Sequence, residues 1–495
     1  MSRARALLLV AICALLAASP STPAQSQPWP QERPPAPLPA RSVDIPAYEI
    51  RTLDNGLQVV AVPQHEQPAV SFRLLVKAGA VQEPADKPGV AGFVAALLNQ
   101  GTTTRSAGDI ATAIDSAGGI LGVSSGNELS FVSGAVIKDR TDLALGLVAE
   151  MVQHPAFAEE EIARQRQQAV SSLQVSYDDP DYLADVVFDR VVYGAHPYGR
   201  TPTPQSVTRI TREDLVTFHR TWFAPNNALL AIVGDLTMDE AFAAAERAFG
   251  GWPRRDVPET TLPAVPAPAR RVVVIDRPGS AQTEIRVGHI GVARTVPEYV
   301  AIDLMVRILG GEGANRLFGV LRSDRGLTYG ASASLNTFRR SGDIVAETDT
   351  RTQVTGEALR LMVDEFARLQ REVVRAAELR GAQEFLSGNF PLTIETPGAI
   401  AQQVLAHLFY GVDLSEIETY REQVDRVSPD DVQTAAKTYL KPEQLTVVLV
   451  GDASAFASQL SGAGFPAFDR IPLAELDLSS PTLRRGAPGA DRDRP

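Results

Sequence analysis

The sequence predicts an α+β protein of two homologous domains, each a mostly antiparallel sheet flanked by helices. Strand-like apolar runs and amphipathic, helix-length stretches recur in the same order in both halves of the chain. Each half also closes on a similar apolar run, Leu229–Asp235 and Thr446–Asp452, and each run ends in Val-Gly-Asp. A proline-rich stretch separates the two halves. The repeated order and spacing indicate an internal duplication.

The domain boundaries follow from composition. We expect an N-terminal domain over residues 47–252, a linker over 253–270 with five prolines, and a C-terminal domain over 271–465. Residues 466–495 are expected to form a largely disordered tail, because the chain end is rich in Arg, Asp, Gly and Pro. Helices of the first domain are predicted at Val90–Asn99, Ala107–Ala117, Arg140–His154, Glu159–Ser176 and Met238–Phe249.

Turn and strand signals complete the pattern. Asp54-Asn55-Gly56 lies between two strand-like runs and predicts a hairpin. The second half begins again with a strand at Arg271–Ile275, and an alternating run follows at Gln282–Val287. These two runs are our candidates for a free sheet edge.

The N-terminus has the form of an export signal. Arg3 and Arg5 precede an apolar run, Ala6–Ala18, and small residues allow cleavage after Ala24. A signal peptide is therefore expected over residues 1–24, followed by a proline-rich leader over 25–46. The apolar run is shorter than the roughly 20 residues of a membrane span, and no later run is long enough either. We expect a periplasmic protein with no membrane span.

Composition excludes several classes of function. A net charge of -12 and a pI near 5.2 argue against a dedicated nucleic-acid binder. The single cysteine, Cys13, lies within the expected signal peptide. The mature chain therefore has no disulfide, no thiolate metal ligand and no thiol nucleophile.

Several segments, in order, resemble the pitrilysin/insulinase family of metallopeptidases. Residues Lys87–Arg105 are similar to the family signature G-x-A-H-F-x-E-H-x-x-x-x-G-T-x-x-R, and Arg322–Tyr329 is similar to its second-domain signature. The resemblance runs from Tyr48 to Gly464. It implies a clamshell half, in which two such domains face a chamber. Further matching segments are Asp178–Pro180, His196–Gly199 and Pro225–Asp235.

The same resemblance implies that the zinc motif is lost. In the motif H-x-x-E-H, two histidines on one helical face bind zinc and the glutamate activates a water. The two histidine positions fall on Gly92 and Ala96, and the base falls on Ala95. The third ligand, a glutamate of a later helix, falls at or near Ser172. No metal is expected in this chain, whose histidines are nowhere three or four positions apart: His65, His154, His196, His219, His289 and His407.

Arg322 and Tyr329 are retained. The resemblance implies that the arginine holds backbone carbonyls of the substrate and that the tyrosine hydroxyl stabilises the oxyanion. Taken alone, the residues also allow a structural interpretation. Tyr329 would then begin a strand over Thr328–Leu335, and Arg322 would end a helix, where a cation suits the helix dipole.

Two functions of different classes follow. The first is the non-zinc subunit of a heteromeric metalloendopeptidase. Arg322 and Tyr329 would complete the active site of a homologous zinc-bearing partner, and the pair would cleave extended or unfolded peptides. This chain alone would then be inactive, and the zinc would belong to the partner. The second is a non-enzymatic, homodimeric scaffold or peptide-binding protein with the same fold. A zinc peptidase with unrecognised ligands is the least favoured interpretation.

Overall fold

The computed structural model describes residues 46–311 and 315–485. These residues belong to the compact unit that begins at Val43. The expected signal peptide (1–24) and all of the leader (25–46) except its last residue lie outside the described part of the chain.

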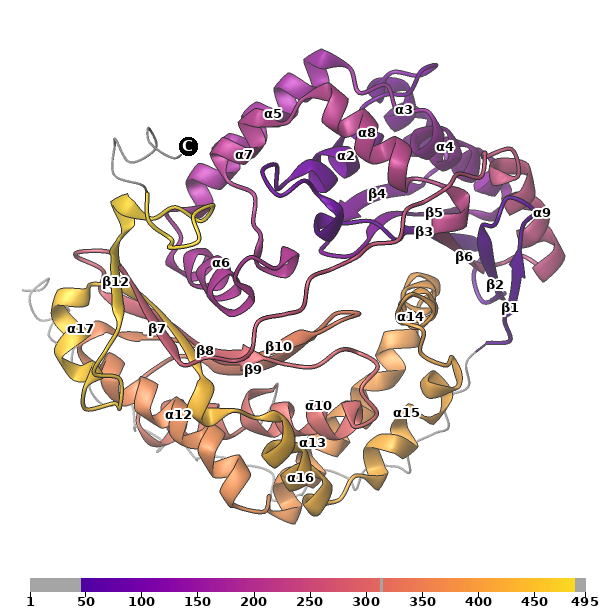
Figure 1. Cartoon of the computed structure of the whole chain (residues 1–495). Helices are drawn as coiled ribbons and strands as arrows, with labels where there is room; N and C mark the ends of the chain where they lie inside the picture. The colour runs from indigo at the N-terminus through magenta and orange to yellow at the C-terminus, as the bar shows by residue number, and fades with distance from the viewer. Residues whose placement is uncertain (1–45, 312–314, 486–495) are drawn as a thin grey trace, which may run out of the picture. The chain divides into compact units, whose positions relative to one another are not determined.

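The first half builds a six-stranded sheet in the order β1-β2-β6-β3-β5-β4 (Figure 1). Only the pair β2–β6 is parallel, so the sheet is mostly antiparallel as predicted. The predicted hairpin joins β1 to β2, with Gly56 at a φ of 92°. The strands are β1 (Glu49–Thr52), β2 (Gln58–Pro63), β3 (Ala69–Val76), β4 (Ile120–Ser125), β5 (Ser130–Ile137) and β6 (Ala228–Gly234).

The second half repeats this arrangement in the order β12-β7-β11-β8-β10-β9. Its last five strands correspond one to one to β2-β6-β3-β5-β4, which confirms the prediction of two homologous sheet-and-helix domains. The outer strand differs, because β12 comes from the C-terminus and pairs with β7 in parallel. The strands are β7 (Arg271–Asp276), β8 (Gln282–Ile290), β9 (Ala331–Thr337), β10 (Gly342–Arg351), β11 (Thr446–Gly451) and β12 (Asp469–Pro472).

The two candidate sheet edges of the second half were placed wrongly. Arg271–Ile275 lies in β7, which has β12 on one side and β11 on the other. Gln282–Val287 lies in β8, between β11 and β10. Because the late strand β11 inserts between β7 and β8, both are interior strands. The edge strands are instead β1 and β4 in the first sheet and β12 and β9 in the second.

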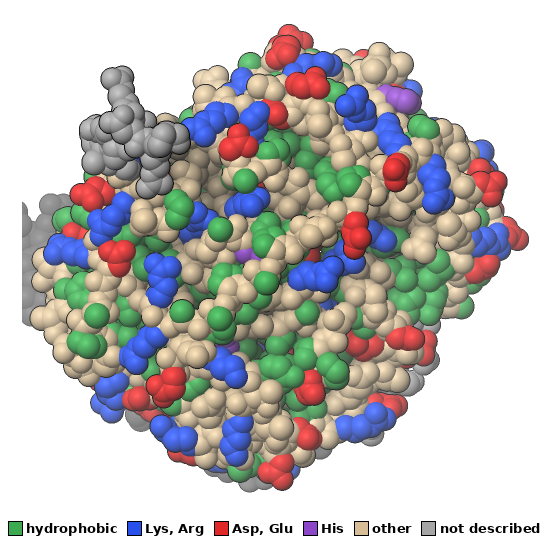
Figure 2. Space-filling view, viewed as in Figure 1, with side chains coloured by type: hydrophobic (Ala, Val, Ile, Leu, Met, Phe, Trp, Pro, Cys, Tyr) green, Lys and Arg blue, Asp and Glu red, His purple; other side chains and the backbone are tan. Residues whose placement is uncertain are grey.

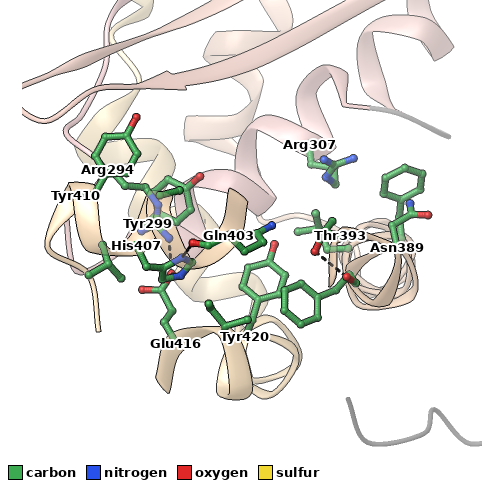
Figure 3. A pocket seen from close by; sticks show the side chains of 16 residues that line it. Arg294, Tyr299, Arg307, Asn389, Thr393, Gln403, His407, Tyr410, Glu416 and Tyr420 are labelled. Carbon is green, nitrogen blue, oxygen red and sulfur yellow. Dashed lines mark hydrogen bonds and ion pairs between the residues drawn. The ribbon is translucent and has the colours of Figure 1, made fainter. Parts of the chain in front are cut away.

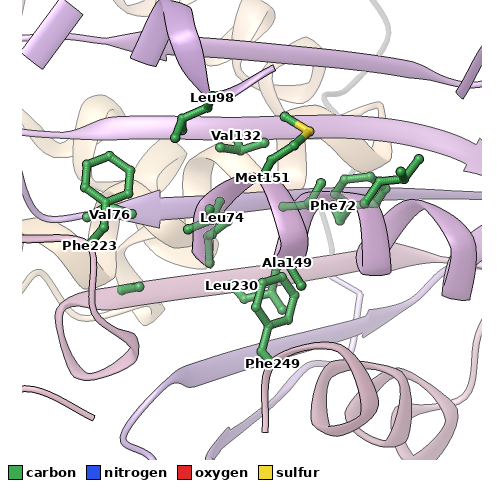
Figure 4. Packing of buried hydrophobic residues seen from close by; sticks show 14 of the residues in the cluster. Phe72, Leu74, Val76, Leu98, Val132, Ala149, Met151, Phe223, Leu230 and Phe249 are labelled. Atoms are coloured by element: carbon green, nitrogen blue, oxygen red, sulfur yellow. The ribbon is translucent and has the colours of Figure 1, made fainter. Parts of the chain in front are cut away.

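The five helices predicted in the first half all form close to their predicted residues, and three further α-helices lie between Pro180 and Trp222. They are α2 (Val90–Leu98), α3 (Ala107–Ser116), α4 (Thr141–Gln153), α5 (Glu159–Ser176), α6 (Pro180–Tyr193), α7 (Pro204–Arg209), α8 (Arg212–Trp222) and α9 (Met238–Phe249). Figure 4 shows how Phe72, Leu74 and Val76 of β3 pack with Met151 of α4 and Val132 of β5. This packing forms the core of the first domain.

The helices of the second half are α10 (Tyr299–Gly310), α11 (Arg316–Phe318), α12 (Thr355–Arg371), α13 (Ala376–Asn389), α14 (Pro397–Tyr410), α15 (Ser415–Arg426), α16 (Pro429–Tyr439) and α17 (Ala453–Leu460). Its core joins side chains of β7, β8, β10 and β11 to those of α10, α12 and α16. No helix within 46–311 and 315–485 is long and apolar enough to cross a membrane.

Two helices are exchanged between the halves. Helix α6, from the first half, packs on β8 and β11 of the second sheet, and α14, from the second half, packs on β3 and β6 of the first sheet. Phe188 of α6 and Val448 of β11 belong to one buried cluster, and Val404 of α14 and Leu229 of β6 belong to another. Each sheet therefore needs a helix from the other half to cover one of its faces.

The expected disordered tail does not hold for residues 466–485. Strand β12 lies in this segment, Ile471 is fully buried, and Leu483 is buried in the same cluster. Arg470 also forms an ion pair with Asp276 at 2.7 Å. Apolar side chains spaced along a Pro- and Ser-rich segment are enough to anchor it to the sheet edge. Residues 486–495 lie outside the described part of the chain.

Candidate functional site

Helix α2 carries three of the four positions to which the sequence resemblance assigns the zinc motif. Its apolar side chains, including Phe93, Val94 and Leu97, are buried against the first sheet. Helix α2 also packs against β4 and α5, and Arg164 of α5 donates to Gln100 just beyond the end of α2 at 2.6 Å. Packing by apolar residues therefore keeps this helix in place without a metal.

The four positions lie on α2 and the neighbouring helix α5, and none offers a suitable ligand. Gly92 is exposed, and the space around the position of a Cβ atom is open. Ala96 is half-buried, Ala95 is buried, and Ser172 of α5 is exposed. No group of three His, Cys, Asp or Glu side chains that could hold a metal exists among the described residues. The residues present therefore do not fit a zinc ion.

A buried carboxylate caps the start of α2. Glu83 accepts hydrogen bonds from the backbone N–H groups of Gly89 (2.9 Å) and Ala91 (2.7 Å). Burial raises the pKa of Glu83 to about 7, although these two donors and the charge of Arg200 act in the opposite direction. Sequence reasoning missed this residue, because the cap lies several residues before the helix and not at the usual N-cap position.

Replacing Glu83 by glutamine should change how stability depends on pH. The folded chain keeps the Glu83 proton above pH 4.5, where the unfolded chain releases it, so this group's contribution is fully present at lower pH and is lost as the pH rises through about 7. Relative to E83Q, we expect the wild-type free energy of unfolding to fall by up to about 3 kcal/mol between pH 4.5 and pH 8. Urea unfolding at several pH values measures this difference. The exposed-site control E66Q should follow the wild type, whereas parallel profiles for wild type and E83Q would contradict the assignment.

Arg322 and Tyr329 lie together on the surface of the second half. Arg322 belongs to a π-helical turn, Gly319–Asp324, and its guanidinium lies 5.1 Å from the centre of the Tyr329 ring. Its Nη1 donates to the backbone oxygen of Thr328 at 3.3 Å. The Tyr329 side chain is 81% exposed. The pair is therefore preformed, with the ring free of core packing in this chain.

The backbone beside Tyr329 is held firmly. Thr328 is buried, and its hydroxyl donates to the backbone oxygen of Gly330 at 2.7 Å. Thr348 of β10 donates to the Thr328 hydroxyl at 3.0 Å. Of the structural interpretation, the strand begins only at Ala331, after Tyr329. Arg322 does lie in the last turn of a helical segment, which is π-helical.

A polar cavity of about 480 Å³ reaches Gly330, next to Tyr329. At its wall the buried Arg286 of β8 donates through Nε to Asp185 of α6 at 2.6 Å and also pairs with Asp181. Arg286 thereby fastens the exchanged helix to the second sheet. The sequence pattern predicted the strand that contains Arg286, but it did not indicate that the ion-pair partners of Arg286 lie about 100 residues earlier in the chain.

A separate cavity of about 620 Å³ lies among α10, α13, α14 and α15 (Figure 3). Arg294 pairs there with Glu416 and lies over the Tyr299 ring at 3.9 Å. Arg307 lies over the Phe385 ring at 4.6 Å. None of the predicted site residues lines this cavity, so we do not assign it to the candidate site.

The sequence of the chain matches the models of two known domain families. Residues 58–200 match the model described as insulinase (peptidase family M16), and residues 209–386 match the peptidase M16 inactive domain. The chain belongs to the M16 family. An uncharacterised zinc protease of Mycobacterium leprae is 27% identical over 406 residues, covering 80% of this chain and 90% of that protein. One of Mycobacterium tuberculosis is 28% identical over 423 residues, covering 83% and 96%.

Several solved structures share the fold. A peptidase M16 inactive domain from Pseudomonas fluorescens has a TM-score of 0.77 and 28% identity, covering 82% of this chain and 98% of that one. A protease from Helicobacter pylori has the same TM-score at 22% identity, covering 82% and 99%. The periplasmic protease PqqL from Escherichia coli has a TM-score of 0.71 at 15% identity, covering 91% of this chain and 50% of that one. The last two likenesses concern the fold alone.

Proposed function

We propose that this M16 protein is the non-zinc subunit of a two-chain endopeptidase and lends Arg322 and Tyr329 to a homologous zinc-bearing partner. The observation that carries the proposal is the pair itself. An 81% exposed tyrosine with an arginine stacked on its ring contributes nothing to the core of this chain. Such a pair is suited to act on something outside the chain, while the zinc positions offer no ligands.

The chemistry of the two groups fits peptide hydrolysis. The guanidinium is permanently charged and can donate to carbonyl oxygens of a bound peptide. The Tyr329 hydroxyl can donate to the oxyanion that forms at the scissile carbonyl. Zinc held by the partner would supply the Lewis acid and the activated water. This chain would position the peptide and stabilise negative charge.

The edge strand β4 offers a place for the peptide itself. It is the last strand of the first sheet, and one side of its backbone has no strand partner. Its side chains alternate between exposed and half-buried, and Ile120 is 70% exposed. An extended peptide could pair with this edge through backbone hydrogen bonds, which select an unfolded substrate and not a particular sequence.

A nucleic-acid substrate is not supported. Figure 2 shows Lys and Arg side chains interspersed with Asp and Glu over the face in view, with no continuous basic surface there. The acidic overall charge agrees with this. The expected export signal makes the periplasm the proposed compartment.

Reconstitution tests the proposal. The purified chain, an M16 protein from the same organism with an intact H-x-x-E-H motif, and their equimolar mixture are each incubated with an internally quenched, unstructured peptide. We expect hydrolysis by the mixture and little by either chain alone. Full activity of the zinc-bearing chain alone, with no complex on size-exclusion chromatography, would contradict the proposal. A stable homodimer of this chain that binds the peptide uncleaved would favour the scaffold function.

A further inference from the structure

A cavity of about 700 Å³ away from Arg322 and Tyr329 concentrates positive charge. It lies between the segment before α2, the segment 195–209, and the C-terminal segment 476–485. Four arginines line it, against only two aspartates, in a chain whose net charge is -12. The arginines are Arg190, Arg200, Arg209 and Arg485, and the aspartates are Asp86 and Asp477.

None of the four arginines forms an ion pair with a described carboxylate. The salt bridges of the described residues lie elsewhere on the chain. Arg190 donates from Nη1 to the backbone oxygen of Gly194 at 2.5 Å, and Arg200 lies 3.5 Å from that of Glu83. Each of these guanidinium groups has five N–H donors, so most remain available.

The two aspartates offset the charge of the four arginines only in part. Oδ1 of Asp477 accepts from the backbone N–H of Ser479 at 2.9 Å and from its hydroxyl at 2.6 Å. Asp86 is exposed. Burial, and next the positive charge of Arg200, lower the pKa of Arg190, while Asp477 acts in the opposite direction. Two guanidinium groups that repel each other inside one cavity gain stability from a shared anion.

Polar groups complete the lining. Tyr177, Thr201, Thr203 and Ser479, which all carry hydroxyl groups, line the same cavity. The volume exceeds that of a single inorganic phosphate and lies within the range of small-molecule sites. Arginines and hydroxyl groups together recognise oxyanions, and arginine binds phosphate and carboxylate through paired hydrogen bonds.

We propose that this cavity binds a small organic molecule carrying a multivalent oxyanion, either phosphate groups or several carboxylates. The bound anion would join Arg190 and Arg200 to the C-terminal segment that carries Ser479 and Arg485. This site is independent of the proposed peptidase function, since it shares no residue with Arg322, Tyr329 or α2.

Calorimetric titration tests the site with inorganic pyrophosphate and citrate, each at constant ionic strength set by sodium chloride. We expect R190Q/R200Q to bind the preferred anion at least about tenfold more weakly than the wild type. The control R360Q/R426Q removes the same charge from two exposed helical arginines and should bind as the wild type does. Preference for pyrophosphate indicates a phosphate ligand, and preference for citrate indicates a polycarboxylate.

A second variant, expected to bind more tightly, keeps the test valid if R190Q/R200Q does not fold. Asp86 is exposed, so D86N should bind the anion about two- to threefold more tightly, because it removes an opposing charge. Equal affinity of wild type, R190Q/R200Q and D86N would overturn the proposal. Absence of measurable binding by the wild type to either anion at millimolar concentration would overturn it as well.

Discussion

Replacing Tyr329 by phenylalanine, or Arg322 by alanine, should lower peptide hydrolysis by the assembled pair by about 10²- to 10³-fold. The phenylalanine ring keeps the stacking contact with Arg322 but has no hydroxyl to donate to the oxyanion. The loss should appear mainly in kcat for Y329F, because the hydroxyl acts on charge that exists only in the transition state. R322A should also raise KM, because the arginine is proposed to hold carbonyls of the bound peptide. Steady-state kinetics of the reconstituted pair measure both effects.

The matched control for this experiment is R325A. Arg325 follows the same π-helical turn, is about half exposed, and pairs with Glu357 at 3.5 Å. The R325A substitution removes one positive charge near Arg322 and leaves Tyr329 unchanged. We expect R325A to retain activity within about twofold, since exposed ion pairs contribute little. Full activity of both R322A and Y329F, with assembly intact, would leave the scaffold function as the better account.

Restoring ligands at the vacated positions should create a zinc site. The variant G92H/A96H/S172E places two imidazoles four residues apart on α2 and a carboxylate on the neighbouring α5. The open space around Gly92 and the exposure of Ser172 allow the new side chains. We expect zinc affinity at least about 100-fold tighter than that of the wild type. Competition with a chromogenic chelator gives the affinity.

The single variant A96H is the control for this site, because one imidazole does not hold zinc tightly. The triple variant should bind close to one zinc per chain, and its thermal unfolding temperature should rise when zinc is added. If G92H/A96H/S172E binds no more zinc than A96H while remaining folded, then Gly92, Ala96 and Ser172 do not correspond to the lost site.

Much of the fold could be predicted because local signals agree with the structure. Helix α5 spans the predicted residues Glu159–Ser176, and its start is marked by three glutamates that favour the helix dipole. Strands β6 and β11 are buried along their whole length, which explains their unbroken apolar runs. The loss of the zinc motif stays a prediction, which rests only on the residue types at its positions.

The features that were missed depend on contacts between distant parts of the chain. Nothing within Pro180–Tyr193 or Pro397–Tyr410 indicates that these helices cover the opposite sheet. The insertion of β11 between β7 and β8 likewise cannot be read from either strand, and together with β12 and β10 it makes both of them interior strands. The ion pairs of Arg286 could not be predicted for the same reason, since its partners Asp181 and Asp185 belong to the exchanged helix.

Zinc content is the most direct test of the central claim that this chain has lost its metal site. The purified mature chain is incubated with excess zinc, passed through a desalting column, and analysed by inductively coupled plasma mass spectrometry. The account predicts far less than one zinc per chain, because no group of three candidate ligands exists among the described residues. A tightly held zinc in a ratio near one per chain would contradict it.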